Sequence, residues 1–363
     1  MSEQKIKIGI TQGDTNGIGC EIIIKALNDS RICDMFTPII YGSSKAFGHY
    51  KRTIAELERF SINIITSVKD AHPKKINLIN VCNDELRIEA GVATSDSGSA
   101  ALAALEAASA ALEAGEIDAV VTAPICKENI QSDIFSFNGH TEYFASKFGG
   151  TPLMMMCSET IKLGLVTTHI ALKEVNQAIS SQTIVDKLGE LRNALRENFM
   201  IVEPKIAVMS INPHAGDGGL MGNEDDTIVK PAIAQAFEKG ILAFGPFAAD
   251  GFFAAAGYSK YDAILPMYHD QGLIPFKTLA HDGVNFTAGL PIVRTSPAHG
   301  VGFDIAGKDM ADPSSMRNAL YAALDILRSR RQYRKMHANP LRRFKRDYGA
   351  DVSVKDLPEE GSN

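Results

Sequence analysis

Three of the nine histidines in the chain come directly after short apolar runs: His169 in "LVTTHIAL", His214 in "MSINPHAGDGG" and His269 in "LPMYHDQG". Imidazole nitrogen is a common ligand of divalent cations, and three protein ligands leave one position open for substrate, as in catalytic metal sites. Each histidine taken alone is better explained as a hydrogen-bonded loop residue. Together, at equivalent places, they favour one shared metal site, formed within one subunit or across two.

The segment "MYHDQGLIPFK" and the residues after it add further polar groups. The apolar run "AILPM" predicts a buried strand, so His269 and Asp270 fall at a strand end, where open α/β sheets bind ligands. Lys277, Asn285 and Arg294 follow, close to a second strand-like run, "GLPIV". An ammonium, an amide and a guanidinium suit a carboxylate or phosphate. The alternative is solvated surface charge, the usual fate of Lys and Arg.

Two further segments have binding and structural interpretations. In "SFNGHTEYF", His140 and Thr141 could contact a phosphate, or Thr141 could cap the helix that follows. The turn "TQGDTNGIGCE" could present backbone N–H groups to an anion at a helix N-terminus. It lacks the residues of a Walker loop and of a dinucleotide-binding loop, so a tight turn between strand and helix is the favoured interpretation.

These segments can form one site only if the fold brings the ends of their strands together. Short apolar runs such as "KIKIGIT", "TPIIYG" and "KIAVMSINPH" alternate with helical patterns along the chain. The Ala-rich helix of residues 97–115 leads directly into the strand "DAVVTAP". Strands separated by amphipathic helices predict an α/β fold with a mainly parallel sheet.

Length and composition limit the class of protein. The 363 residues favour two domains, and the net charge of −6 argues against nucleic-acid binding. Five scattered cysteines without a CxxC pair argue against a disulfide framework and indicate a reducing cytoplasm. We expect no membrane span, because no stretch approaches about 20 apolar residues, and the start has no signal-peptide pattern.

Nine motifs in order resemble one family, the 4-hydroxythreonine-4-phosphate dehydrogenases of pyridoxal phosphate biosynthesis. They include "GDTNGIG", "VVTAPICKE", "GHTEYFA", "NPHAGDGG", "GPFAAD" and "GVNFTAGLPIVRTSPAHG". The segment "HGVGFDIAGKDMAD" is also similar to the adenine-side loop of isopropylmalate and isocitrate dehydrogenases. Where the family commonly has "GDPAGIGPE", this chain has Thr15, Asn16 and Cys20 in place of Pro, Ala and Pro.

The resemblance implies the fold of isocitrate and isopropylmalate dehydrogenases, with two α/β/α subdomains, mainly parallel sheets and an active-site cleft between them. Residues 1–135 with 297–346 would form the cofactor side. Residues 136–296 would form the metal and substrate side, with the dimer interface. Residues 347–363 would be a loose polar tail.

The resemblance also implies roles for individual residues. His169, His214 and His269 would bind one divalent metal ion (Zn, Mg or Co) at the interface of a homodimer. The substrate contacts would be His140, Thr141, Lys277, Asn285 and Arg294. The catalytic group would be His269, Asp270, Asp250 and Lys277. The nicotinamide cofactor, NAD or NADP, would contact His299, Gly300, Asp304 and Ile305.

The implied reaction oxidises 4-phosphooxy-L-threonine, a small phosphorylated amino acid, to a β-keto acid that decarboxylates to 3-amino-2-oxopropyl phosphate. A metal bound to the reacting oxygen would stabilise the developing alkoxide. A related dehydrogenase of threonate or erythronate phosphate is the nearest alternative. A phosphate acyltransferase is disfavoured by the three histidines, and a non-catalytic binding protein by the retained "HGVGFDIAG".

Overall fold

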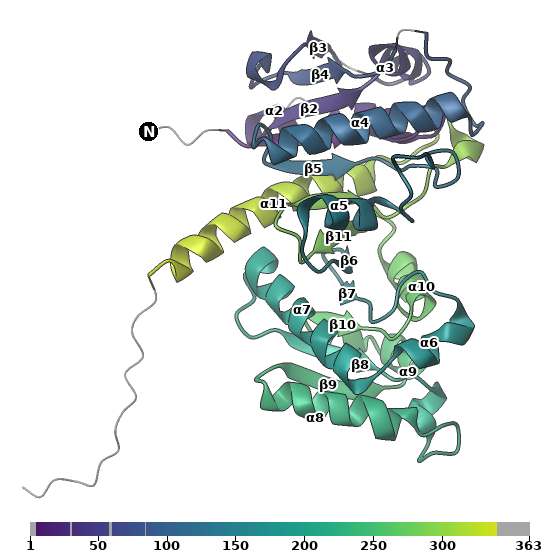
Figure 1. Cartoon of the computed structure of the whole chain (residues 1–363), viewed down its shortest axis with the longest axis vertical. Helices are drawn as coiled ribbons and strands as arrows, with labels where there is room; N and C mark the ends of the chain where they lie inside the picture. Colours follow the sequence, from purple (N-terminus) through teal and green to yellow (C-terminus); the bar gives the residue numbers. More distant parts are fainter. Residues whose placement is uncertain (1–4, 30, 58–59, 84, 340–363) are drawn as a thin grey trace, which may run out of the picture.

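A single twelve-stranded sheet runs through the part of the chain that the computed structural model describes, residues 5–29, 31–57, 60–83 and 85–339 (Figure 1). The polar tail expected at 347–363 lies outside these residues. In spatial order the strands are β3 (Ile62–Ile65), β4 (Ile76–Asn80), β2 (Thr37–Gly42), β1 (Lys7–Thr11), β5 (Ala119–Thr122), β12 (Arg294–Pro297), β11 (Val284–Ala288), β6 (Leu153–Cys157), β7 (Lys162–Gly164), β10 (Ala263–Leu265), β8 (Lys205–Met209) and β9 (Leu242–Phe247).

The sheet is parallel at both ends and antiparallel in the middle. The six strands from β3 to β12 pair in parallel, as do β7, β10, β8 and β9. Between them, β11 pairs antiparallel with β12 and with β6, and β6 pairs antiparallel with β7. The predicted α/β class with a mainly parallel sheet is confirmed, and the two parallel regions share one sheet because β11 joins them.

Helices cover both faces of this sheet. They are α1 (Gly19–Leu27), α2 (Ile32–Met35), α3 (Ser44–Lys51), α4 (Ser95–Glu113), α5 (His140–Phe148), α6 (Leu172–Ala178), α7 (Ser181–Phe199), α8 (Lys230–Glu238), α9 (Ala249–Ala254), α10 (His269–Leu279) and α11 (Ser314–His337). Strand β5 shows the arrangement, because Val121 packs in the core with α1 and α11 while Val120 packs with α4 and α5. No helix in the described ranges is long and apolar enough to cross a membrane.

Local sequence explains where α4 begins and ends and why the chain turns between β11 and β12. The Ala-rich helix is α4, which begins after Thr94, where a capping box joins Thr94 and Ser97, and its last turn leads through Gly115 to β5. The strand expected at "GLPIV" is wrong, because these residues form the turn between β11 and β12. Gly289 has φ +76°, which departs from extended backbone and ends the strand. A Cβ there would lie 2.0 Å from the carbonyl oxygen of Thr151, so only glycine fits.

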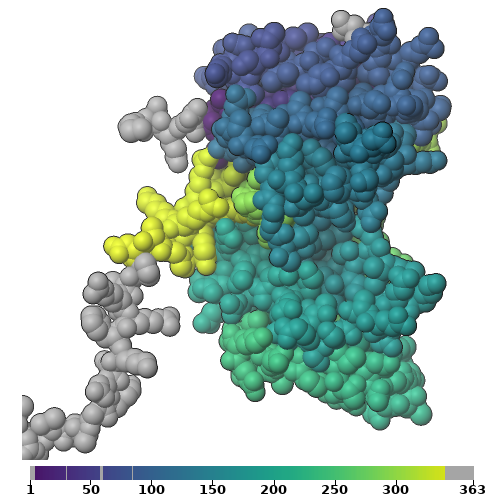
Figure 2. All heavy atoms as spheres, in the orientation of Figure 1, coloured from purple at the N-terminus to yellow at the C-terminus, as the bar shows by residue number. Residues whose placement is uncertain are grey.

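The three strands that precede the histidines are neighbours, in the order β7, β10, β8, and they run in parallel. Their carboxyl ends therefore lie at one edge of the sheet, as the sequence predicted. Figure 2 shows the elongated body that results, with the C-terminal part of α11 standing away from it.

Candidate functional site

A cavity of about 290 Å³ opens where β5, β12 and β11 meet α5 and α10. The five residues expected to contact substrate, two of the three candidate metal ligands and part of the candidate cofactor loop all line it. Its polar and charged side chains are Thr122, Lys127, His140, Thr141, Glu142, His169, His269, Lys277, Asn285, Arg294, Ser296 and His299. Segments more than 100 residues apart in the chain are thus brought together by the sheet.

Arg294 places a buried positive charge at this cavity. Its side chain is 2% exposed, and its guanidinium donates to the hydroxyls of Thr122 and Thr287. Within the described ranges it forms no ion pair; Glu142 acts on it only as a nearby negative charge. Burial lowers the pKa of Arg294 to about 9 because the charged form is desolvated. An anion in the cavity would supply the missing counter-charge.

Three more buried polar atoms at the cavity have no hydrogen-bond partner: His140 Nε2, Asn285 Oδ1 and His299 Nε2. A buried polar group without a partner is costly, so groups of this kind commonly mark a place where a ligand or water binds. With Arg294, they form a polar surface suited to a phosphorylated ligand.

Helix α5 presents His140 and Thr141 to the cavity. The helix begins at His140, and its N-cap is Gly139, which makes no side-chain capping bond. Thr141 therefore does not cap the helix and is available to a ligand. Burial, aided by the positive charges of Arg294 and Lys127, holds the pKa of His140 well below its usual value, so its imidazole is neutral.

His169 and His269 face each other with ring centroids 5.8 Å apart. The Nδ1 atom of His269 lies 2.7 Å from Asp270 Oδ1, a contact that orients the imidazole and leaves Nε2 free to bind a ligand. Burial, together with the positive charge of Lys127, lowers the pKa of His169 and keeps it neutral. A pair of imidazoles at this distance fits two positions of a divalent metal site.

The third histidine does not join this pair within one chain. His214 lies with Asp250 and Asp270 along a separate, largely apolar hollow of about 730 Å³, between the β8 end and α10. His214 has left-handed backbone, with φ 53°, in the turn of residues Pro213–Gly216. Among the residues that the structure describes, no group of three or more His, Cys, Asp or Glu side chains is placed to hold a metal ion.

The candidate cofactor loop begins at the cavity and leads away from it. His299 and Gly300 line the cavity, whereas Asp304 and Ile305 belong to a short 3-10 helix, Phe303–Ile305, farther along. The glycine turn of the N-terminal half supports this loop, because the N–H of Ile18 donates to the carbonyl of Val301.

The altered residues of the glycine turn are part of the core. Asn16 is fully buried; its amide donates to Val92 and Thr94, and its carbonyl accepts the N–H of Glu89. The turn therefore has a structural role, as the sequence favoured. Thr15 and Cys20 stand where the family commonly has proline, so the turn lacks those rigid rings. Asn16, at the position of the common alanine, holds the turn through side-chain hydrogen bonds.

Lys127 and Glu142 line the cavity and were not predicted from the sequence. Lys127 follows β5 in "VVTAPICKE", and its position five residues after a strand end was the available signal. Glu142 lies in the first turn of α5, where an acidic residue is favoured for structural reasons and carries no specific signal of a binding site. It is the single acidic side chain among the residues that line the cavity.

Comparisons with known proteins identify the family. Residues 34–323 match the model of a family described as pyridoxal phosphate biosynthetic protein PdxA. The chain is 46% identical to a 4-hydroxythreonine-4-phosphate dehydrogenase of Bacteroides thetaiotaomicron, over 99% of this chain and 100% of that protein. It is 38% identical to a protein of Cutibacterium acnes provisionally named D-threonate 4-phosphate dehydrogenase, over 88% of this chain and 94% of that one.

A solved structure is similar along its whole length. The 4-hydroxythreonine-4-phosphate dehydrogenase of Klebsiella pneumoniae aligns with a TM-score of 0.76 at 33% identity, covering 90% of this chain and 99% of that one. The fold, the polar cavity and these relatives define an α/β oxidoreductase of the dehydrogenase class. More narrowly, the chain belongs to the family of pyridoxal phosphate biosynthetic protein PdxA.

Proposed function

We propose that this enzyme oxidises 4-phosphooxy-L-threonine with a nicotinamide cofactor, in the biosynthesis of pyridoxal phosphate. The β-keto acid formed would lose carbon dioxide to give 3-amino-2-oxopropyl phosphate. Relatives named for this activity, the 46% identical protein among them, support the assignment.

The observation that carries the proposal is the buried guanidinium of Arg294 at a cavity with three unpartnered polar atoms. Arg294 and Lys277 would bind the anionic groups of the substrate, and Asn285 and Thr141 would fix its orientation. The neutral imidazole of His140 can donate from one ring nitrogen without adding a charge. The most polar end of the substrate would thus be held by side chains from α5, α10, β11 and β12.

A divalent metal fits His169 and His269, but a three-histidine site needs a ligand from elsewhere. We propose a homodimer in which His214 of the partner subunit completes the site, because His214 of the same chain faces the separate hollow. Bound there, the metal would polarise the reacting hydroxyl group of the substrate. His269 keeps its orientation for this role through Asp270.

The nicotinamide cofactor would approach from the loop after β12. His299 and Gly300 line the same cavity as the substrate residues, and His299 Nε2 is a buried atom without a partner. An imidazole there could donate to or accept from the nicotinamide carboxamide. Asp304 and Ile305, farther along the loop, would contact the remainder of the dinucleotide.

The five cysteines are all free thiols, two at intermediate depth and three buried. Free thiols persist in reducing compartments. This supports a cytoplasmic location, which we propose together with the function.

The test is a substrate panel with the purified protein. We expect reduction of NAD or NADP, followed by absorbance, with 4-phosphooxy-L-threonine and one of Zn, Mg or Co added. The specific alternative is D-threonate 4-phosphate, because relatives provisionally named for it are also 38% identical. Turnover of the threonate phosphate alone would replace the proposed substrate, and no turnover of either would refute the proposal.

A further inference from the structure

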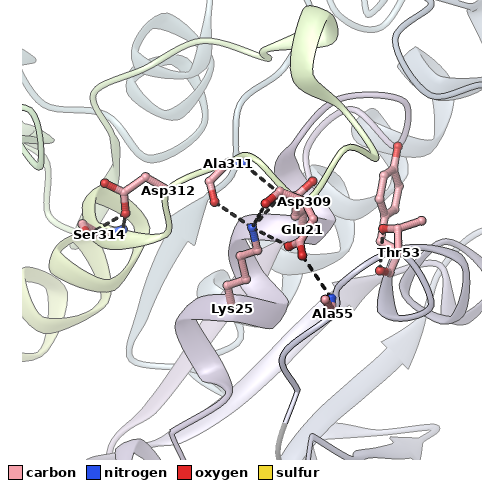
Figure 3. A network of polar contacts seen from close by, with 9 residues as sticks. Glu21, Lys25, Thr53, Ala55, Asp309, Ala311, Asp312 and Ser314 are labelled. Atoms are coloured by element: carbon pink, nitrogen blue, oxygen red, sulfur yellow. Dashed lines mark hydrogen bonds and ion pairs between the residues drawn. The ribbon is translucent and has the colours of Figure 1, made fainter.

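Lys25 joins helix α1, which also carries Glu21, to the segment that contains Asp309 and Ala311 (Figure 3). Its ammonium donates to Glu21 Oε1 at 2.8 Å, to the carbonyl oxygens of Asp309 and Ala311 at 3.1 and 3.0 Å, and pairs with Asp309 Oδ1 at 2.9 Å. The side chain of Glu21 is fully buried and that of Lys25 is 16% exposed. A buried cation surrounded by acceptors fixes their relative positions, because removing it leaves several of them unsatisfied.

The other groups of this network bind the same segment. The N–H of Ala311 donates to Glu21 Oε1 at 2.9 Å, and the N–H of Ala55 donates to Asp309 Oδ2 at 3.0 Å. The segment around Asp309 is therefore tied both to α1, which carries Glu21 and Lys25, and to the chain just after α3.

Asp309 adopts a backbone conformation that a side chain rarely takes. Its φ is +60°, in the left-handed region. Asp and Asn tolerate this region better than most residues, but it still has to be stabilised by surrounding contacts. Here the ion pair to Lys25 and the bond from Ala55 supply that stabilisation. Both oxygens of the Asp309 carboxylate thus stabilise the left-handed backbone at Asp309.

The turn at Asp309 ends the segment that begins at the cavity. Residues 298–311 follow β12, and the N–H of Ala298 donates to the hydroxyl of Ser315. The segment lines the cavity at His299 and Gly300. The carbonyl of the next residue, Val301, accepts the N–H of Ile18. Beyond Ile305, the next anchors are Asp309 and Ala311. The part that would contact the cofactor is therefore hydrogen-bonded to the rest of the chain at Ile18 and at the Lys25 network, with Ile305 and Ala306 packed against the core between these anchors.

We propose that Lys25, with Asp309 and Glu21, positions the nicotinamide cofactor site by fixing the segment 298–311 in place. The inference rests on the proposed function, because that function makes the segment a cofactor loop. None of the three side chains lines the cavity, so they act through the loop and not on the substrate.

The experiment compares the parent with Lys25→Met, Lys25→Arg and Asp309→Asn. Lys187→Met is the matched control, because Lys187 forms a similarly half-buried ion pair with Glu190 on α7. Binding of NADH and NADPH is titrated by the fluorescence of the reduced nicotinamide, and the Michaelis constants of cofactor and substrate are measured separately. Backbone hydrogen exchange of residues 298–311 is followed without any ligand, and melting temperatures check that each variant is folded.

We expect Lys25→Met and Asp309→Asn to weaken cofactor binding about 5- to 50-fold, in the range that loss of a charged hydrogen bond permits. Exchange in the segment should accelerate, while kcat and the Michaelis constant for substrate stay within about twofold. Lys25→Arg should recover part of the affinity, and Lys187→Met should leave it unchanged. A lower melting temperature with unchanged cofactor binding and exchange would overturn the inference.

A second outcome separates this inference from the proposed function. If the folded parent bound neither nicotinamide nucleotide, the proposed function would fail. The positioning of the segment would then be judged by hydrogen exchange alone: faster exchange in Lys25→Met but not in Lys187→Met would uphold it, and equal exchange would refute it.

Discussion

Arg294 and Thr122 meet at the polar cavity, where Nη2 and Nε of the guanidinium donate to one hydroxyl oxygen over 2.7 and 3.2 Å. They come from neighbouring parallel strands, β12 and β5. A hydroxyl orients the guanidinium without neutralising it, so its charge remains for a ligand. The guanidinium is therefore held in one orientation and keeps its positive charge, and both properties favour binding of a phosphate or carboxylate.

Replacing Arg294 by Met should raise the Michaelis constant for the phosphorylated substrate by roughly 10- to 150-fold, since a charged hydrogen bond contributes about 1.5 to 3 kcal/mol. The measurement compares the substrate with its dephosphorylated analogue, on which the effect of the mutation should largely disappear if Arg294 binds the phosphate. Arg330→Met is the control: Arg330 is also buried, but it donates to Asn198 and to backbone carbonyls away from the cavity. Equal Michaelis constants in parent and Arg294→Met would contradict the assignment.

His140 should make the protein less stable in mild acid. Its pKa is lowered in the folded chain and returns to about 6.5 on unfolding, so below that pH the unfolded chain binds more protons. The free energy of unfolding therefore falls as pH drops below about 6.5, and His140 contributes no pH dependence above it. His140→Gln should reduce this slope, with His169 retaining part of it. Urea denaturation between about pH 5 and 8 measures it; a slope unchanged from the parent would argue against a neutral buried imidazole.

Asp270→Asn should weaken metal binding by about 10- to 100-fold, the typical loss when the partner that orients a ligating histidine is removed. The reason is the contact between His269 Nδ1 and Asp270 Oδ1, which leaves Nε2 of His269 free to bind the proposed metal. Competition with a coloured chelator measures the affinity without turnover. Asp262→Asn, a change at a carboxylate that accepts the N–H of Lys205, is the control. Equal affinity in parent and Asp270→Asn would refute the role.

Two impaired variants should complement each other when they are mixed and assayed at a substrate concentration well below the Michaelis constant of Arg294→Met. In the proposed dimer, each site takes Arg294 from one chain and His214 from the other. A dimer of one His214→Ala chain and one Arg294→Met chain therefore has one intact site and one site that carries both changes. Random exchange should then recover about a quarter of the parent activity. Sedimentation of the parent should show a dimer, and a fully active monomer would contradict the shared site. If His214 acts within its own chain, mixing restores no activity, and the proposed shared site is wrong.

The glycine turn offers a paired stability test. Asn16→Ala should lower the free energy of unfolding by about 2 to 3 kcal/mol, because it removes three hydrogen bonds of a fully buried side chain and leaves the N–H of Glu89 without its acceptor. Thr15→Val should be neutral or stabilising, since Thr15 Oγ1 is buried without a partner. Urea denaturation compares the two, and a harmless Asn16→Ala would contradict the structural role of the turn.

The sequence predicted well those features that depend on local pattern. The Ala-rich helix with its following strand became α4 and β5, and the three histidines follow neighbouring parallel strands. Alternation of helices and apolar runs sufficed for the α/β class. The antiparallel centre was not predicted, because "LMMMC" and "VNFTA" are short and reveal their partners only once the sheet is assembled.

The position of His214 could not be predicted from the sequence, because it depends on the backbone conformation of its turn. Its turn has two consecutive non-glycine residues, His214 and Ala215, in left-handed conformation, which residue type disfavours. That turn directs His214 to the hollow beside α10 instead of to the cavity. Glu142 was not predicted for a different reason: an acidic residue in the first turn of a helix is common, so its position alone does not indicate a binding site.

The antiparallel pairing of β11 with β12 and with β6 has a mechanical consequence. Two lobes joined by a flexible hinge can swing around a ligand, but here an unbroken ladder of backbone hydrogen bonds crosses from one region to the other. Bending the sheet at β11 would break some of these hydrogen bonds. A wide rotation of one parallel region of the sheet against the other is therefore costly. Entry and exit of ligands should therefore depend on movement of the segments at the rim of the sheet, and the speed with which those segments rearrange would limit product release.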